Sequence, residues 1–85
     1  MDVKSMVEGY REELVKRLGT LVSINSEEGT PEADAPFGAG PRDALQAALK
    51  MCAADGFQTV NLENYAGYAE IGAGKECIGI VGHLD

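Results

Sequence analysis

Apolar residues recur every three or four positions along the first part of the chain, which is the spacing of one face of an α-helix. The pattern predicts a single amphipathic helix over residues 2–22, with charged side chains on the opposite face. Asp2 precedes the first apolar position and can cap the start of this helix. The apolar stripe consists of Val3, Met6, Val7, Tyr10, Leu14, Leu18 and Leu21.

The helical pattern ends over residues 23–40, where turn-forming residues dominate and a loop is expected. A loop of this length is uncommon in a compact domain and often has a function. Its acidic residues lack the regular spacing and the fixed glycine of a calcium-binding loop, so we expect solvated surface. These residues are Glu27, Glu28, Glu32 and Asp34.

A second helix is predicted between Pro41, which suits the first helical position, and Gly56, which suits the position just past the last. Small and apolar residues share one face of this helix and would let it approach a sheet closely. We expect this face to form core and to have no direct function. It consists of Ala44, Leu45, Ala48, Leu49 and Cys52.

From Phe57 onward the period of the pattern changes to two, which predicts strands. Strands are expected over residues 57–62 and 65–71, with Gly67 as a candidate bulge. Residues 77–81 are expected to form a third strand, and they are apolar on both faces. Such a run is typical of a strand buried on both sides in a sheet covered by helices.

These elements predict the α/β class, with two helices and about three strands. Residues 1–85 would form one portion of a single domain, because a chain of this length buries only a modest core. The third strand needs more strands and more helical cover than this sequence supplies. We therefore expect an incomplete, truncated piece of a mixed sheet covered by helices.

Composition restricts the partners and the location. The net charge is −7 and the few basic residues are scattered, which argues against nucleic acid or an anionic membrane as partner. No stretch approaches the ~20 apolar residues of a membrane span, and the charged N-terminal region does not resemble a signal peptide. Cys52 and Cys77 lie in apolar stretches and are expected to be reduced core thiols. A cytoplasmic location fits best.

Two chemistries are disfavoured by the spacing of their candidate groups. The glycine-containing segment before Lys75 is followed by Glu76, where a phosphate-binding loop needs Ser or Thr. Cys77 and His83 lie six residues apart along an expected strand. That separation is on the order of 20 Å, too far for a thiol–imidazole pair.

His83, the only histidine, and Asp85 are the strongest candidates for chemistry. Side chains two residues apart in extended chain point the same way, so the imidazole and the carboxylate would lie side by side. Imidazole is a common metal ligand, and a carboxylate on its second nitrogen fixes the ring. Taken alone, this pair is weak evidence, and a structural, non-functional histidine is the better interpretation.

The surrounding residues make the metal-ligand interpretation stronger. The terminal hexapeptide Ile80-Val81-Gly82-His83-Leu84-Asp85 resembles the first metal motif of the di-zinc exopeptidases, a family that includes carboxypeptidase G, aminoacylase, carnosinase and succinyl-diaminopimelate desuccinylase. Further segments are most similar to the bacterial dipeptidase V type, so that the resemblance covers essentially the whole chain. They are Leu21-Val22-Ser23-Ile24-Asn25-Ser26, Pro36-Phe37-Gly38-Ala39-Gly40-Pro41, Ala44-Leu45, Asp55-Gly56-Phe57, Tyr65-Ala66-Gly67 and Ile71-Gly72-Ala73-Gly74.

The resemblance implies roles for two residues. His83 would bind one zinc of a pair, and Asp85 would serve the catalytic site by holding the His83 ring. In the complete parent enzyme, water activated by two Zn²⁺ ions would attack the peptide bond of a dipeptide. The other ligands, the general base and the smaller lid domain would come from sequence absent here. We therefore expect an N-terminal fragment that is inactive alone and binds zinc weakly or not at all.

Three alternatives remain open at this stage. The parent could be a related amide hydrolase, such as an aminoacylase or a desuccinylase, acting on another small amide. The chain could instead be a non-enzymatic, acidic α/β module that binds a protein partner. Its uncovered strands could also pair with copies of the chain.

Overall fold

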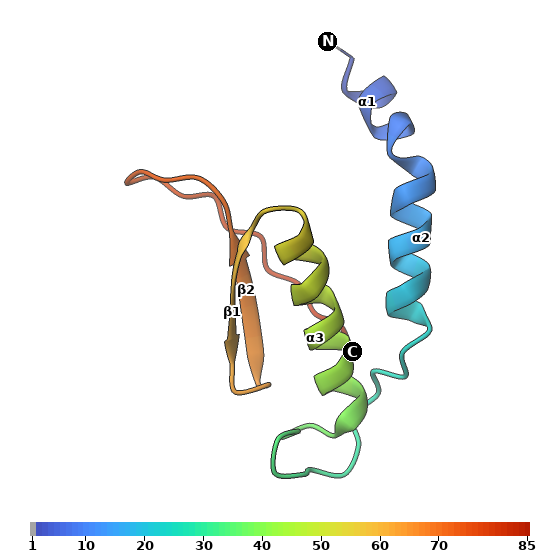
Figure 1. Cartoon of the computed structure of the whole chain (residues 1–85), viewed down its shortest axis with the longest axis vertical. Helices are drawn as coiled ribbons and strands as arrows, with labels where there is room; N and C mark the ends of the chain where they lie inside the picture. Colours follow the sequence, from blue (N-terminus) through green and yellow to red (C-terminus); the bar gives the residue numbers. More distant parts are fainter. Residues whose placement is uncertain (1) are drawn as a thin grey trace.

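The structure is a computed structural model that describes residues 2–85, and it contains three helices and one two-stranded sheet within them (Figure 1). The α/β class predicted from the sequence is confirmed. In chain order the elements are α1 (Val3–Gly9), α2 (Arg11–Val22), α3 (Ala39–Ala54), β1 (Gln58–Leu62) and β2 (Ala66–Glu70).

The prediction of a single helix over residues 2–22 is wrong in one respect. The helix breaks at Tyr10 into α1 and α2. Tyr10 takes φ −99° and ψ 2°, outside the helical range, and donates its amide to the Val7 carbonyl at 3.0 Å. Gly9 directly precedes it and lowers the helical preference of this turn. The predicted cap is confirmed, since Asp2 Oδ1 accepts the Lys4 amide at 3.0 Å.

Helix α3 lies against the β1–β2 hairpin, and this contact forms the centre of the fold (Figure 1). The two strands pair antiparallel with Asn61 opposite Gly67 in a regular register, so the bulge suggested for Gly67 does not form. A Cβ atom at Gly67 would lie 2.9 Å from Leu49 Cδ1 and 3.1 Å from Leu45 Cδ1. The missing side chain therefore lets α3 approach the sheet closely.

The hairpin turn uses two residues with left-handed backbone, Glu63 at φ 55° and Asn64 at φ 63°. The Tyr65 amide closes the turn by donating to the Leu62 carbonyl at 3.0 Å. Three residues, 63–65, connect the paired Leu62 and Ala66. Asn is one of the few side chains that adopt left-handed backbone readily.

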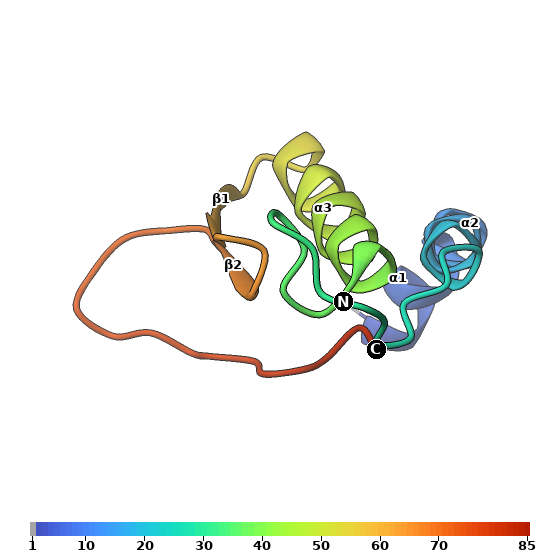
Figure 2. The ribbon, with the colours of Figure 1, turned by 90° about the horizontal axis from the view of Figure 1, so that it is seen from below.

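The third strand predicted over residues 77–81 does not form. This segment is extended but unpaired, and Ile78, Ile80 and Val81 are 94–99% exposed. A strand needs a neighbour for its backbone hydrogen bonds. Residues 71–85 instead leave the hairpin in a wide arc that returns to the start of α3 (Figure 2). Cys77 is consequently exposed, not a core thiol, whereas Cys52 on α3 is half-buried.

The chain is far more open than a folded domain of its size. Its accessible surface is 7085 Å², compared with about 4,900 Å² expected for a compact monomer of 9.0 kDa. Its radius of gyration is 14.9 Å, compared with about 12 Å for a compact domain. Ala35 and Ala44 are the only buried hydrophobic residues among residues 2–85. The α/β piece is incomplete in the sense that much of its apolar surface has no cover.

An ion pair joins α2 to the end of α3. Arg17 donates to both carboxylate oxygens of Asp55, with Nη2 2.8 Å from Oδ1, and its Nε also contacts Glu13 at 2.9 Å. The hydrogen bonds from Arg17 hold the pKa of Asp55 below its usual value, and the same contacts raise the pKa of Arg17.

No helix in residues 2–85 is long and apolar enough to cross a membrane.

We expect the docking of α2 on α3 to depend on pH through Asp55. Because folding lowers the Asp55 pKa, the ion pair contributes fully above the pH range in which ordinary aspartates titrate. This contribution is lost as the pH falls through the lowered pKa. NMR of the Asp55 carboxyl carbon should show a depressed titration midpoint that returns toward the usual range in Arg17→Met. Arg11→Met is the matched control, since Arg11 pairs with Glu8 and should leave the Asp55 midpoint unchanged. An equal shift in both variants would contradict this assignment.

Candidate functional site

One pocket of about 430 Å³ lies where the last residues of the chain return to the start of α3. Its walls come from four places: residues 82–85, the loop before α3, the start of α3, and the hairpin turn. His83 and Asp85 both line it. The structure therefore places the two residues predicted from the sequence in a concave site.

The imidazole of His83 is held by Asp85. His83 Nδ1 lies 3.0 Å from Asp85 Oδ1, and the two side chains remain 82% and 66% exposed. This contact assigns the proton to Nδ1, which donates to the carboxylate and leaves the lone pair of Nε2 free to bind a ligand. The predicted pairing of the two side chains is present, although no strand carries them.

Ser26 fixes this terminal segment to the rest of the chain. Its hydroxyl donates to the Leu84 carbonyl at 2.7 Å, across 58 positions of sequence. Sequence reasoning did not single out Ser26, because a serine in a loop has no distinctive pattern of its own. Its place in the family-like segment of residues 21–26 was the available signal.

Two aromatic rings form the apolar wall of the pocket. Phe37, from the loop, and Tyr65, from the hairpin turn, meet edge to face with ring centroids 5.6 Å apart and an interplanar angle of 89°. This geometry is favourable for aromatic pairs. It joins two segments that are distant in sequence and gives the pocket an apolar wall.

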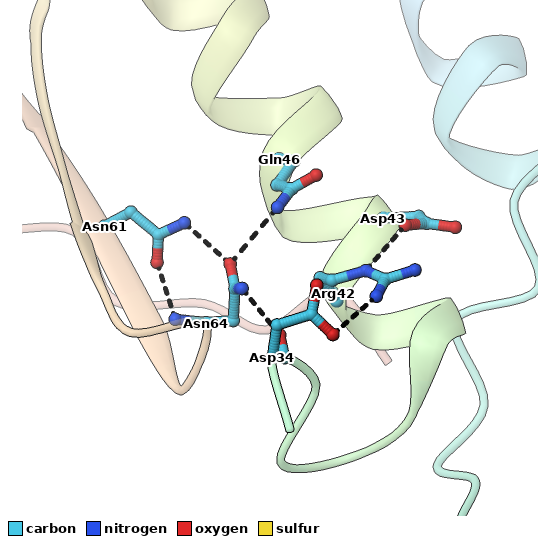
Figure 3. A network of polar contacts seen from close by, with 6 residues as sticks. All are labelled: Asp34, Arg42, Asp43, Gln46, Asn61 and Asn64. Carbon is cyan, nitrogen blue, oxygen red and sulfur yellow. Dashed lines mark hydrogen bonds and ion pairs between the residues drawn. The ribbon is translucent and has the colours of Figure 1, made fainter. Parts of the chain in front are cut away.

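A polar network around Asn64 fixes the loop against the hairpin (Figure 3). Asn64 Nδ2 donates to the Asp34 carbonyl at 2.7 Å, while its Oδ1 accepts from Asn61 at 2.7 Å and from Gln46 at 3.4 Å. The Asp34 carboxylate in turn accepts from Arg42 of α3 at 2.9 Å. The loop is therefore held from the hairpin and from α3 at once.

Arg42 is the cation of this network and is half-buried. It donates to Asp43 at 3.0 Å as well as to Asp34, and these contacts raise the pKa of Arg42. The acids of the loop are exposed, as the sequence predicted, and Asp34 is also paired with Arg42.

Within residues 2–85, no group of three or more His, Cys, Asp or Glu side chains could hold a metal ion. His83 and Asp85 supply one imidazole and one carboxylate, which suits a single ligand and its orienting partner but not a whole zinc centre.

Comparisons with known proteins find similar stretches in bacterial dipeptidases. No family model matches the chain. It is 38% identical to the Beta-Ala-Xaa dipeptidase of Lactobacillus delbrueckii subsp. lactis over 87 residues, which cover 100% of this chain and 18% of that protein. Proteins of Staphylococcus epidermidis and Staphylococcus aureus (strain USA300) that carry dipeptidase names are 37% and 34% identical over 96% of the chain and 18% of their own length.

Over its whole length, the chain is similar to one part of these dipeptidases.

The resemblance to dipeptidases of the bacterial type is thereby confirmed. The chain spans less than a fifth of the length of the relatives it matches. The region aligned with the Lactobacillus protein includes positions 83 and 85 of this chain, because 100% of the chain is aligned.

Asn64→Gly should loosen the loop around the pocket. The glycine keeps the left-handed backbone but removes three side-chain hydrogen bonds, at a cost of about 1–3 kcal/mol. We expect faster hydrogen exchange at the Ala35 amide, which donates to Glu32 inside the loop at 3.1 Å.

Glu63→Gly is the matched control for this experiment. It changes the neighbouring left-handed residue, for which no side-chain hydrogen bond exists within residues 2–85. Exchange at Ala35 should stay unchanged or slow slightly. Equal acceleration in both variants would show that the turn backbone, and not the Asn64 side chain, holds the loop.

Proposed function

We propose that this chain contributes one metal-binding histidine to a zinc-dependent dipeptidase, which hydrolyses a peptide bond with metal-activated water. The observation that carries this proposal is the match of the whole chain to a Beta-Ala-Xaa dipeptidase. The geometry of His83 and Asp85 supports it, since the pair has the arrangement of a metal ligand and its orienting carboxylate.

In this proposal each side chain has a defined task. Asp85 accepts the Nδ1 proton of His83 and so fixes both the ring orientation and the tautomer that presents Nε2. When bound, zinc supplies the Lewis acidity that activates water and polarises the scissile carbonyl. Ser26 holds the segment in place through Leu84. Asp85 thus acts in catalysis through His83.

The pocket suits a small substrate. Its volume of about 430 Å³ lies at the lower end of the usual range for ligand pockets. Phe37 and Tyr65 would cover an apolar part of a dipeptide, while the polar residues face its reacting end. A related amide, as hydrolysed by an aminoacylase or a desuccinylase, is the alternative substrate class for the same pocket.

We propose that the chain has no hydrolase activity by itself. One imidazole and one carboxylate do not complete a zinc site, which usually has four ligands.

We also propose a reducing, cytoplasmic location. Its support is that Cys52 and Cys77 are both free, and that Cys77 is exposed where an oxidising environment would modify it.

Zinc binding by the isolated chain is expected to be weak and to involve His83. Because His83 is the only histidine, its ring protons give a single set of NMR signals that should shift on addition of Zn²⁺. Asp85→Asn should raise the zinc concentration needed by about tenfold or more. Asp2→Asn is the control, since Asn caps a helix as well as Asp does. Unchanged ring signals at saturating zinc would refute the ligand assignment, and stoichiometric sub-micromolar binding would refute an incomplete site.

A chimera tests the dipeptidase function itself. The Lactobacillus dipeptidase would carry this chain in place of its own matching residues. We expect it to hydrolyse β-alanyl dipeptides, and to lose about 10–100-fold in kcat/KM with Asp85→Asn and more with His83→Ala. Asp2→Asn should leave kcat/KM unchanged. Full activity of the His83→Ala chimera would disprove the proposed role, and preference for N-acetyl or N-succinyl amino acids would favour the alternative amide hydrolases.

A further inference from the structure

Ser26 makes a hydrogen bond to the segment that carries His83 and Asp85. Its hydroxyl donates to the Leu84 carbonyl at 2.7 Å, and Leu84 lies between these two residues in sequence. Ser26 itself is half-buried. The contact therefore acts on the peptide group that joins Leu84 to Asp85.

The backbone around Ser26 is fixed against α3. A Cβ atom at Gly40, in the first turn of α3, would overlap the Asn25 carbonyl oxygen, so the missing side chain permits this close approach. On the other side of Ser26, the Glu27 amide donates to Asn25 Oδ1 at 3.2 Å. Ser26 thus lies in a part of the loop whose backbone is held on both sides, and its hydroxyl is a fixed donor.

A fixed Leu84 carbonyl restricts the position of Asp85. The backbone torsion that orients this carbonyl also decides where Asp85 begins, and Asp85 Oδ1 lies 3.0 Å from His83 Nδ1. A functional constellation must be held within about 0.5 Å by its supporting residues. The hydrogen bond from Ser26 supplies such support from a distant part of the sequence.

The loop that carries Ser26 also forms part of the pocket wall. Phe37 lines the pocket, and its carbonyl accepts the Gly29 amide at 2.8 Å, which closes the loop. One closed loop therefore contacts the metal-binding segment through Ser26 and supplies the apolar wall through Phe37.

We propose that Ser26 is a positioning residue of the His83–Asp85 pair. Its hydroxyl holds the Leu84 carbonyl, so that Asp85 stays on His83 Nδ1 and Nε2 stays free for a metal ion. Ser26 acts through the Leu84 backbone and is not itself a ligand. This role rests on the proposed function of His83 as a zinc ligand.

Metal-free NMR of the 85-residue chain tests the positioning itself. Ser26→Ala removes the hydroxyl, so the Asp85 amide should become more mobile in ¹⁵N relaxation measurements. The share of His83 in the Nδ1–H tautomer should fall, because the carboxylate is no longer held beside the ring. The ring nitrogen shifts report this share at alkaline pH, where the imidazole is neutral.

Two further variants separate the hydroxyl from the volume of the side chain. Ser26→Thr keeps a hydroxyl donor and should preserve the native mobility and tautomer. Ser26→Val has the same shape as the Thr variant without the donor and should behave as Ser26→Ala does. Exchange at the Ala35 amide checks in each variant that the loop is still folded.

Ser23→Ala is the matched control. The Ser23 hydroxyl donates to the Thr20 carbonyl at 2.6 Å, a contact of similar length that is confined to the end of α2. Its loss should leave the Asp85 amide and the His83 ring unchanged.

Addition of Zn²⁺ connects the positioning to metal binding. The midpoint of the shift of the His83 ring signals should move to about two- to tenfold higher Zn²⁺ in Ser26→Ala, the range expected for the loss of one neutral hydrogen bond. Ser26→Thr and Ser23→Ala should keep the native midpoint.

The other outcomes overturn the proposal and separate it from the proposed function. Native mobility and tautomer in Ser26→Ala would exclude the positioning role and leave zinc binding by His83 standing. Equal losses in Ser26→Ala and Ser26→Thr would show that the hydroxyl is not the cause. Altered positioning with an unchanged zinc midpoint would show a purely structural contact. Native ring signals that do not respond to Zn²⁺ would refute the proposed function, and this role with it.

Discussion

The close approach of α3 to the β1–β2 hairpin is the contact on which the rest of the structure depends. Gly67 makes it possible, because a side chain there would meet Leu45 and Leu49 of the helix and the Val60 carbonyl of the neighbouring strand. A second close approach brings the loop to the first turn of α3. A Cβ atom at Gly40 would lie 1.8 Å from the Asn25 carbonyl oxygen, so only glycine fits. The hairpin and the loop thus both contact the same helix at residues without side chains.

The pocket follows from these two contacts. Once the hairpin and the loop lie on α3, Asn64 reaches the Asp34 carbonyl, and Phe37 meets Tyr65. The terminal segment then closes the pocket, but the Ser26–Leu84 hydrogen bond is its main attachment to the loop. Within this arrangement His83 is oriented by its local partner Asp85 and not by burial. Its geometry can therefore be right for a metal ligand while its surroundings remain open to solvent.

Burial is the quantity that this chain lacks. Hydrophobic stabilisation grows with the apolar area removed from water, and the apolar sides of α2 and of residues 77–81 remain in contact with it. The link between α2 and α3 relies instead on the exposed Arg17–Asp55 pair, and pairs of this kind contribute little in water. The dipeptidases that resemble this chain in sequence are more than five times as long as the matched region, because that region covers 18% of each of them.

The sequence by itself determined the local elements and the candidate pair. Periodicity predicted α3 and both strands of the hairpin, Asp2 was identified as a cap, and the two-residue spacing of His83 and Asp85 predicted that their side chains meet. These features depend on neighbours close in sequence, and local propensity and spacing therefore suffice to predict them. The break at Tyr10 is local, but the periodicity of the apolar residues continues across it and does not reveal it. Only the tertiary structure decided the role of Gly67 and the link from Ser26 to Leu84. It also decided that residues 77–81 remain unpaired, because a strand forms only beside another strand, and no periodicity in a sequence shows whether that neighbour is present.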